Sequence, residues 1–101
     1  MKPHAGMNVN AGVSPVVAGN RGFSSTITRV AAGHYRLTLD NGLAQNEMLI
    51  LTQINEDITN AGANGVSNVT VGAVTTIDVK TWLNTGLTDL DFAIGVFNLR
   101  A

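Results

Sequence analysis

Few side chains in this sequence could do chemistry, and histidine is the first residue type to consider. His4 and His34 are the only histidines, and the chain has no cysteine. Hydrolytic catalysis would need one of these imidazoles beside a serine and a carboxylate. His34 alternates with apolar residues next to Arg36, so we expect it to be solvated on the polar side of a strand, and His4 lies among small residues. The pattern predicts no catalytic residues and a protein that is not an enzyme.

Carboxylate side chains are the second candidate, because hard cations bind oxygen ligands. Asp89 and Asp91 are separated by one residue and could together help to bind Ca²⁺. The other residues of a calcium-binding loop are absent around them, so we expect both side chains to solvate a turn. Glu47, Glu56 and Asp57 form no recognisable acid–base pair. We therefore expect neither a metal ion nor another cofactor.

The single tryptophan, Trp82, is the remaining candidate for ligand contact. It falls on the same side of an alternating segment as Asp78 and Lys80, opposite Ile77 and Val79. An exposed tryptophan there could stack on a sugar ring or anchor a protein interface. A tryptophan at the end of a strand could equally cap the core. Both interpretations stay open from the sequence.

Charge and hydropathy exclude two classes of partner. No glycine-rich phosphate loop is present, and the six basic residues are scattered rather than clustered, which argues against nucleic-acid binding. The longest strongly apolar run, residues 48–51, is far shorter than the ~20 residues of a membrane span. No apolar stretch of the kind found in a signal peptide follows Met1. We expect a protein made in a cytoplasm and used in soluble form or in a particle.

The spacing of turn residues indicates the fold class. Glycine and asparagine recur at short intervals, and the runs between them are rich in Val, Ile, Thr, Leu and Phe. This pattern is typical of a small antiparallel β-sandwich. The 101 residues suffice for one domain, divided here into an extended N-terminal arm with a possible first strand at 1–22 and the sandwich at 23–101. We expect strands over 23–30, 34–40, 46–55, 66–74, 75–83 and 92–99, with an exposed loop at 56–65.

Two of these segments are apolar on both sides. In the first, Met48 and Ile50 alternate with Leu49 and Leu51. In the second, residues 92–99, phenylalanine, isoleucine and valine on one side alternate with alanine, phenylalanine and leucine on the other. A strand that is apolar on both faces is buried on both faces. Its second face therefore packs either inside the domain or against another subunit.

Two stretches carry a resemblance to a known family. Residues 27–39 (ITRVAAGHYRLTL) resemble the hairpin T-x-x-x-x-G-x-Y-x-[LV]-T-[LF] of β-sandwich domains in bacteriophage fibres and related virion proteins. Residues 77–97 are similar to the closing strands of the same domains, which end in F-x-[IV]-x-[VI]-[FY]. The resemblance implies a jelly-roll-like sandwich that assembles as a trimer on a virus particle.

The resemblance also implies where partners would bind. The residues expected at the trimer interface are Met48, Ile50, Phe92, Ile94 and Phe97, and those expected to contact the capsid are Pro3, Val9, Val13 and Val16. The chain begins at Met1 and lacks the repetitive shaft of a fibre, which favours a capsid decoration or cement protein. Its partners would be further copies of itself and the major capsid protein or another virion protein. Its location would be the virion, after synthesis in the host cytoplasm.

The alternative function is a receptor-binding tip domain of a tail fibre or spike. In that interpretation Trp82 and the loop at 56–65 would contact carbohydrate or protein on the host cell.

Overall fold

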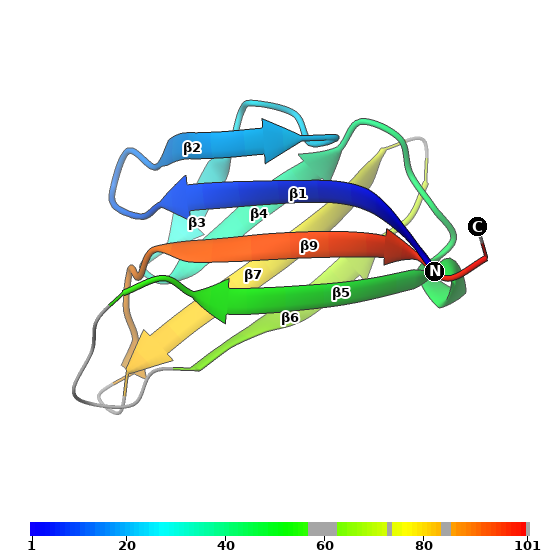
Figure 1. The fold of residues 1–101 in the computed structure, drawn as a ribbon. Helices are drawn as coiled ribbons and strands as arrows, with labels where there is room; N and C mark the ends of the chain where they lie inside the picture. Colours follow the sequence, from blue (N-terminus) through cyan, green and yellow to red (C-terminus); the bar gives the residue numbers. More distant parts are fainter. Residues whose placement is uncertain (57–62, 73, 84–85, 101) are drawn as a thin grey trace.

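A computed structural model describes residues 1–56, 63–72, 74–83 and 86–100. Two antiparallel sheets lie one over the other (Figure 1), an arrangement compatible with the small β-sandwich expected from the sequence. The strands are β1 (Lys2–Asn10), β2 (Val16–Arg21), β3 (Thr28–Ala31), β4 (His34–Leu39), β5 (Met48–Ile54), β6 (Ala63–Thr70), β7 (Thr75–Leu83), β8 (Gly86–Leu87) and β9 (Phe92–Asn98). A 3-10 turn, η1 (Gln45–Glu47), precedes β5.

The first sheet, called sheet A here, has the strand order β2-β1-β9-β5. Its two central strands are the first and the last of the chain, which pair from Lys2 opposite Asn98 to Val9 opposite Phe92. Strand β5 continues the sheet beyond β9, with Leu51 opposite Gly95. The two ends of the described chain therefore lie side by side (Figure 1).

The second sheet, sheet B, has the order β3-β4-β7-β6, and the short β8 pairs with the end of β7. Strands β3 and β4 form the hairpin expected from the sequence, and it turns at Gly33. The φ angle of Gly33 is +67°, in the left-handed region that glycine adopts without strain. A Cβ atom at this position would also lie 2.5 Å from the carbonyl oxygen of Thr81, so the turn has no room for a side chain.

One core fills the space between the sheets. Alternate residues of β4 and β7 in sheet B, and of β9 and the second half of β1 in sheet A, point into it, as the two-residue period of a strand requires. The rings of Tyr35 and Phe92 meet across the sheets with centroids 5.6 Å apart. The buried residues of this cluster are Met7, Val9, Phe23, Tyr35, Leu37, Leu39, Ile77, Val79, Phe92, Ile94 and Val96.

The N-terminal segment differs from the expected extended arm. Residues 2–21 form β1 and β2, which are half of sheet A, and Met7 and Val9 are core residues. The physical reason is that the N-terminal strand pairs with β9 along almost its whole length. Without β1, both β9 and the core would lose their neighbour on that side.

Candidate functional site

The five residues expected at a trimer interface lie on two faces of sheet A. Phe92 and Ile94 are core residues, 0% and 4% exposed, and Met48 and Ile50 are half-buried against the same core. Their side chains face sheet B. Burial leaves Phe92 and Ile94 no surface for the expected contact with another subunit, while Met48 and Ile50 keep an accessible part. Phe97 has the opposite orientation, because its neighbour Val96 is a core residue. The expected strands thus have an outward face, but four of the five residues lie on the inner one.

The outer face of sheet A is mostly apolar on its β9–β5 side, where Gln53 is the polar exception. Leu49 and Leu51 of β5 lie opposite Phe97 and Gly95 of β9, and Leu51 is 54% exposed. Ala93 continues the row along β9. These residues form the second apolar side of β5 and β9. Burial in the core explains only the first, inward side of the two strands. The name "sheet A face" is used below for the outward residues Leu49, Leu51, Ala93, Gly95 and Phe97.

Small residues leave hollows along this face. Gly95 has no side chain, and the ring of Phe97 lies over it, 3.4 Å from where a Cβ atom would be. A hollow of about 500 Å³ lies there between Leu51, Ala93 and Phe97. A second hollow of about 410 Å³ continues it across β9 and β1 toward β2. The outer surface of sheet A is therefore hollowed. The hollow beside β5 is mostly apolar, whereas the one toward β2 includes Asn8, Asn20 and Arg21 in its lining.

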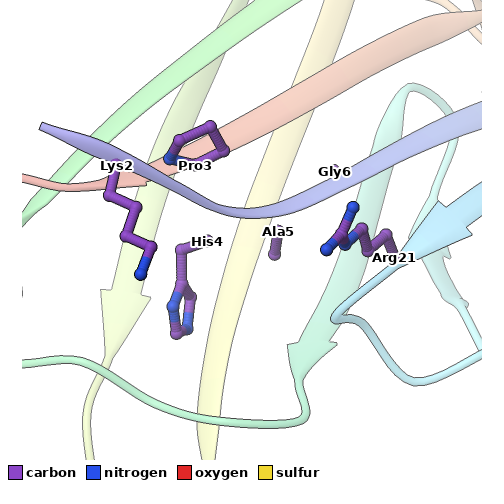
Figure 2. A pocket seen from close by; sticks show the side chains of 6 residues that line it. All are labelled: Lys2, Pro3, His4, Ala5, Gly6 and Arg21. Atoms are coloured by element: carbon purple, nitrogen blue, oxygen red, sulfur yellow. The ribbon is translucent and has the colours of Figure 1, made fainter.

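A third hollow, of about 420 Å³, lies beside the beginning of β1 (Figure 2). Lys2, His4 and Arg21 contribute basic side chains to it, and Pro3 lies at its edge. The imidazole Nε2 of His4 is hydrogen-bonded to the carbonyl oxygen of Asn41, so this ring is held against a neighbouring loop. His4 is thus a structural contact between β1 and that loop.

The residues expected to contact a capsid also separate into two groups. Val13 and Val16 are 79% and 58% exposed, and Pro3 is exposed as well, so all three are accessible. Val9 is 1% exposed and belongs to the core. Because Val9 is buried between the two sheets, its side chain is not available for the expected contact with a capsid.

Asp89 and Asp91, considered above as cation ligands, hold the end of the sandwich together. The Oδ1 atom of Asp89 accepts hydrogen bonds from the Gly33 amide and from the Tyr35 hydroxyl, both at 2.7 Å. Arg29 adds an ion pair of 2.8 Å to Oδ2. Asp91 accepts a 2.7 Å hydrogen bond from the amide of Ala11. Both carboxylates are thus bonded to protein donors rather than solvating a turn.

The environment of Asp89 favours its charged form. The hydrogen bonds from the Arg29 guanidinium, the Tyr35 hydroxyl and the Gly33 amide lower the pKa of Asp89 to about 2, although partial burial opposes them. In the described part of the chain, no three His, Cys, Asp or Glu residues gather as metal ligands would. The sequence could not reveal this cluster, because the donors lie more than fifty residues before Asp89.

His34 belongs to a second cluster of polar side chains, which surrounds the carboxylate of Asp78 on the outer face of sheet B. Its Nε2 atom is 2.9 Å from Oδ2 of Asp78, and its side chain is only 17% exposed, so the expectation of a solvated histidine is wrong. Arg36 donates to both oxygens of Asp78, at 2.8 and 2.9 Å. These hydrogen bonds, those from Arg36 foremost, lower the pKa of Asp78. Asp78 is thereby an ion-paired anchor for its neighbours rather than a free base.

Trp82 lies further along the same outer face, as the alternation predicted, and is 37% exposed. The Cη2 atom of its ring is 3.8 Å from the place where a Cβ atom of Gly65 would be. The indole therefore extends sideways over the neighbouring strand β6 instead of capping the core. The loop expected at 56–65 is strand in its last part, because β6 begins at Ala63, and residues 57–62, including Asp57, lie outside the described residues.

Comparison with known proteins gives no relative from which a function could be transferred. No protein-family model, no curated protein and no solved structure matches the chain. In the described part of the chain there is also no helix with the length and apolarity to cross a bilayer.

Proposed function

We propose that the chain is a structural protein of a bacteriophage virion, whose copies associate as a trimer through the sheet A face and decorate the capsid. The observation that carries the proposal is the row of outward apolar residues on β5 and β9, beside a hollow whose lining includes Gln53, Ala93 and Gly95. Leu51 is exposed and the other residues of the face are half-buried. Large exposed apolar patches mark contacts with other macromolecules. The virion and the trimer come from the sequence resemblance.

The strand order supports a jelly-roll-like topology in part. A jelly roll is a long hairpin rolled up, so its strands pair from the outside of the chain inward. Here β1 pairs with β9, β4 pairs with β7, and β5 packs near β6. Strands β2 and β3 add one edge strand to each sheet. The β1–β9 and β4–β7 pairs are nested in this way, whereas β5 pairs with β9 rather than with β6, and β1–β2 and β3–β4 are sequential hairpins. The jelly-roll class itself comes from the sequence resemblance.

Burial of apolar area would drive the association. A stable interface covers about 800 Å² on each partner, which is roughly one seventh of the 5597 Å² surface of this chain. Burying apolar surface stabilises a complex by about 25 cal/mol per Å² before the costs of association. Val13 and Val16, exposed at the β1–β2 turn, and Pro3, exposed at the opposite end of β1, would supply the contacts with the shell.

The mass of the purified protein tests the trimer. Size-exclusion chromatography with light scattering should give about 32 kDa, three times the 10.6 kDa of the chain. Leu51→Asp places a carboxylate on the sheet A face and should give the monomer mass, because a buried unpaired charge is strongly unfavourable. Leu87→Asp is the matched control, since Leu87 is similarly exposed at 48% but belongs to sheet B.

Two results would contradict the proposed assembly. The first is a wild-type protein that stays monomeric at high micromolar concentration. The second is an equal loss of mass in Leu51→Asp and Leu87→Asp, which would show that the sheet A face has no special part. The decoration role is tested separately, by heating particles with and without the protein: particles that lack it should release their genome at a lower temperature.

A further inference from the structure

The outer face of sheet B combines an aromatic surface with oriented polar groups. The exposed indole of Trp82 extends over Gly65, where the absence of a side chain lets the ring approach the sheet. Lys80 lies two residues before Trp82 on the same face, and its register neighbours are His34 on β4 and Gly65 on β6. The ammonium group, the imidazole and the indole therefore share one region of the sheet.

The charges of this region are unequal. The carboxylate of Asp78 is engaged by Arg36 and His34, and its side chain is only 6% exposed. Within the described residues, no carboxylate forms an ion pair with Lys80. Among the described residues, the accessible charge beside the indole is therefore positive, and it complements an anionic group on a ligand.

We infer that the outer face of sheet B around Trp82 is a binding surface for acidic carbohydrate. A sugar ring has an apolar C–H face that stacks on an indole, and a rim of hydroxyl groups that exchange hydrogen bonds with polar side chains. Lys80 would pair with the carboxylate or sulfate of the sugar, and His34 and Arg36 would face its hydroxyl groups. Leu87, opposite Trp82 in register and 48% exposed, extends the apolar part of the surface.

This inference concerns a different face from the proposed assembly and does not depend on it. The sheet A face and the Trp82 surface lie on the outer sides of two sheets that share one core. A molecule bound at one of them leaves the other accessible. Glycan binding by a monomer would refute the proposed trimer and leave the inference intact.

An array of immobilised glycans tests the inference, with sialylated, uronate-containing, sulfated and neutral saccharides as probes. The intact protein should be retained by acidic glycans more than by neutral ones of the same length. Trp82→Ala should weaken retention roughly tenfold, the loss of one aromatic contact. Lys80→Gln should weaken binding of the acidic glycans about two- to fivefold, as for an exposed ion pair, and leave the neutral ones unchanged.

Lys2→Gln is the matched control, because it removes an exposed lysine from sheet A. It should not alter retention. Since Trp82 is the only tryptophan, saturable change of its emission on titration with a retained glycan confirms contact at this surface. The inference is overturned if no glycan is retained, or if Lys2→Gln weakens retention as much as Lys80→Gln. Loss of oligomer mass in Trp82→Ala without any glycan binding would instead identify the surface as a protein interface.

Discussion

The carboxylate of Asp89 gives the sharpest prediction about stability. It accepts hydrogen bonds from the Tyr35 hydroxyl, the Gly33 amide and the Arg29 guanidinium. These bonds join the segment before β9 to the β3–β4 hairpin. Asp89→Asn keeps the shape of the side chain but removes its charge. The amide nitrogen can no longer accept the hydrogen bonds from Arg29, and a donor would then face a donor.

The magnitude follows from the pKa of Asp89. Its ordinary value of 3.8 falls to about 2 in the folded protein. At 1.36 kcal/mol for each pKa unit, the charged form contributes at most about 2 kcal/mol, because the side chain is still 23% exposed. A carboxyl with a lowered folded pKa stabilises the protein above its unfolded pKa, and this stabilisation is lost as the pH falls through the folded pKa. The contribution should therefore be complete above about pH 5 and decline from about pH 4 to pH 2.

Urea unfolding followed by the emission of Trp82 measures this contribution. At pH 7 the free energy of unfolding of Asp89→Asn should be lower than that of the wild type by about 2 kcal/mol, and the difference should shrink between pH 4 and pH 2. Asp40→Asn is the control, because it neutralises an exposed carboxylate. Equal stability of Asp89→Asn and the wild type at pH 7 would refute the reasoning. A difference that stays constant down to pH 2 would refute its electrostatic part.

Two further substitutions test the turn and the core by the same measurement at pH 7. Gly33→Ala should lower the free energy of unfolding by about 1–3 kcal/mol or more. The reason is that φ is +67° and the new Cβ atom would meet the carbonyl oxygen of Thr81. Gly72→Ala, where a Cβ atom meets nothing within 4 Å, should change it little, and equal effects would contradict this account. Leu37→Ala should cost about 2–5 kcal/mol, because Leu37 is 0% exposed in the core. A loss below 1 kcal/mol would mean that the two sheets do not pack tightly there.

Strands with a clear two-residue period could be predicted from the sequence. Residues 34–39 alternate between core side chains and polar ones, and β4 begins and ends within one residue of the prediction. The bounds predicted for β7 match those of the structure, and those predicted for β5 and β9 lie within two residues of it. In each of these strands the hydrophobic period is a local property, so it needs no knowledge of the partner strands.

Strand β1 shows why the N-terminal region was less predictable. It carries glycine and two asparagines, and only Met7 and Val9 of its residues are buried. Their spacing, with Ala5 packed against the core before them, is a two-residue period that could have indicated a strand. The pairing with β9 nevertheless stabilises β1 from the far end of the chain, and no local pattern records that partner.

The inner and outer faces of β5 and β9 could not be distinguished from sequence. Met48 and Ile50 are as apolar as Leu49 and Leu51, so the period is the same for either face. The position of sheet B decides which side becomes core. The same limitation applies to Asp89, whose ion-pair partner Arg29 is sixty residues away.

The two outer faces of the sandwich differ in the interactions that they can make. The sheet A face has apolar side chains and grooves, which gain free energy when water is excluded by a second protein surface. The outer face of sheet B has ion-paired groups held in place by Asp78, which lose little by remaining in water. If copies associate through sheet A, sheet B becomes the outer surface of the assembly. Several copies of the Trp82 surface would then be presented together, and glycan contacts that are weak singly would reinforce one another.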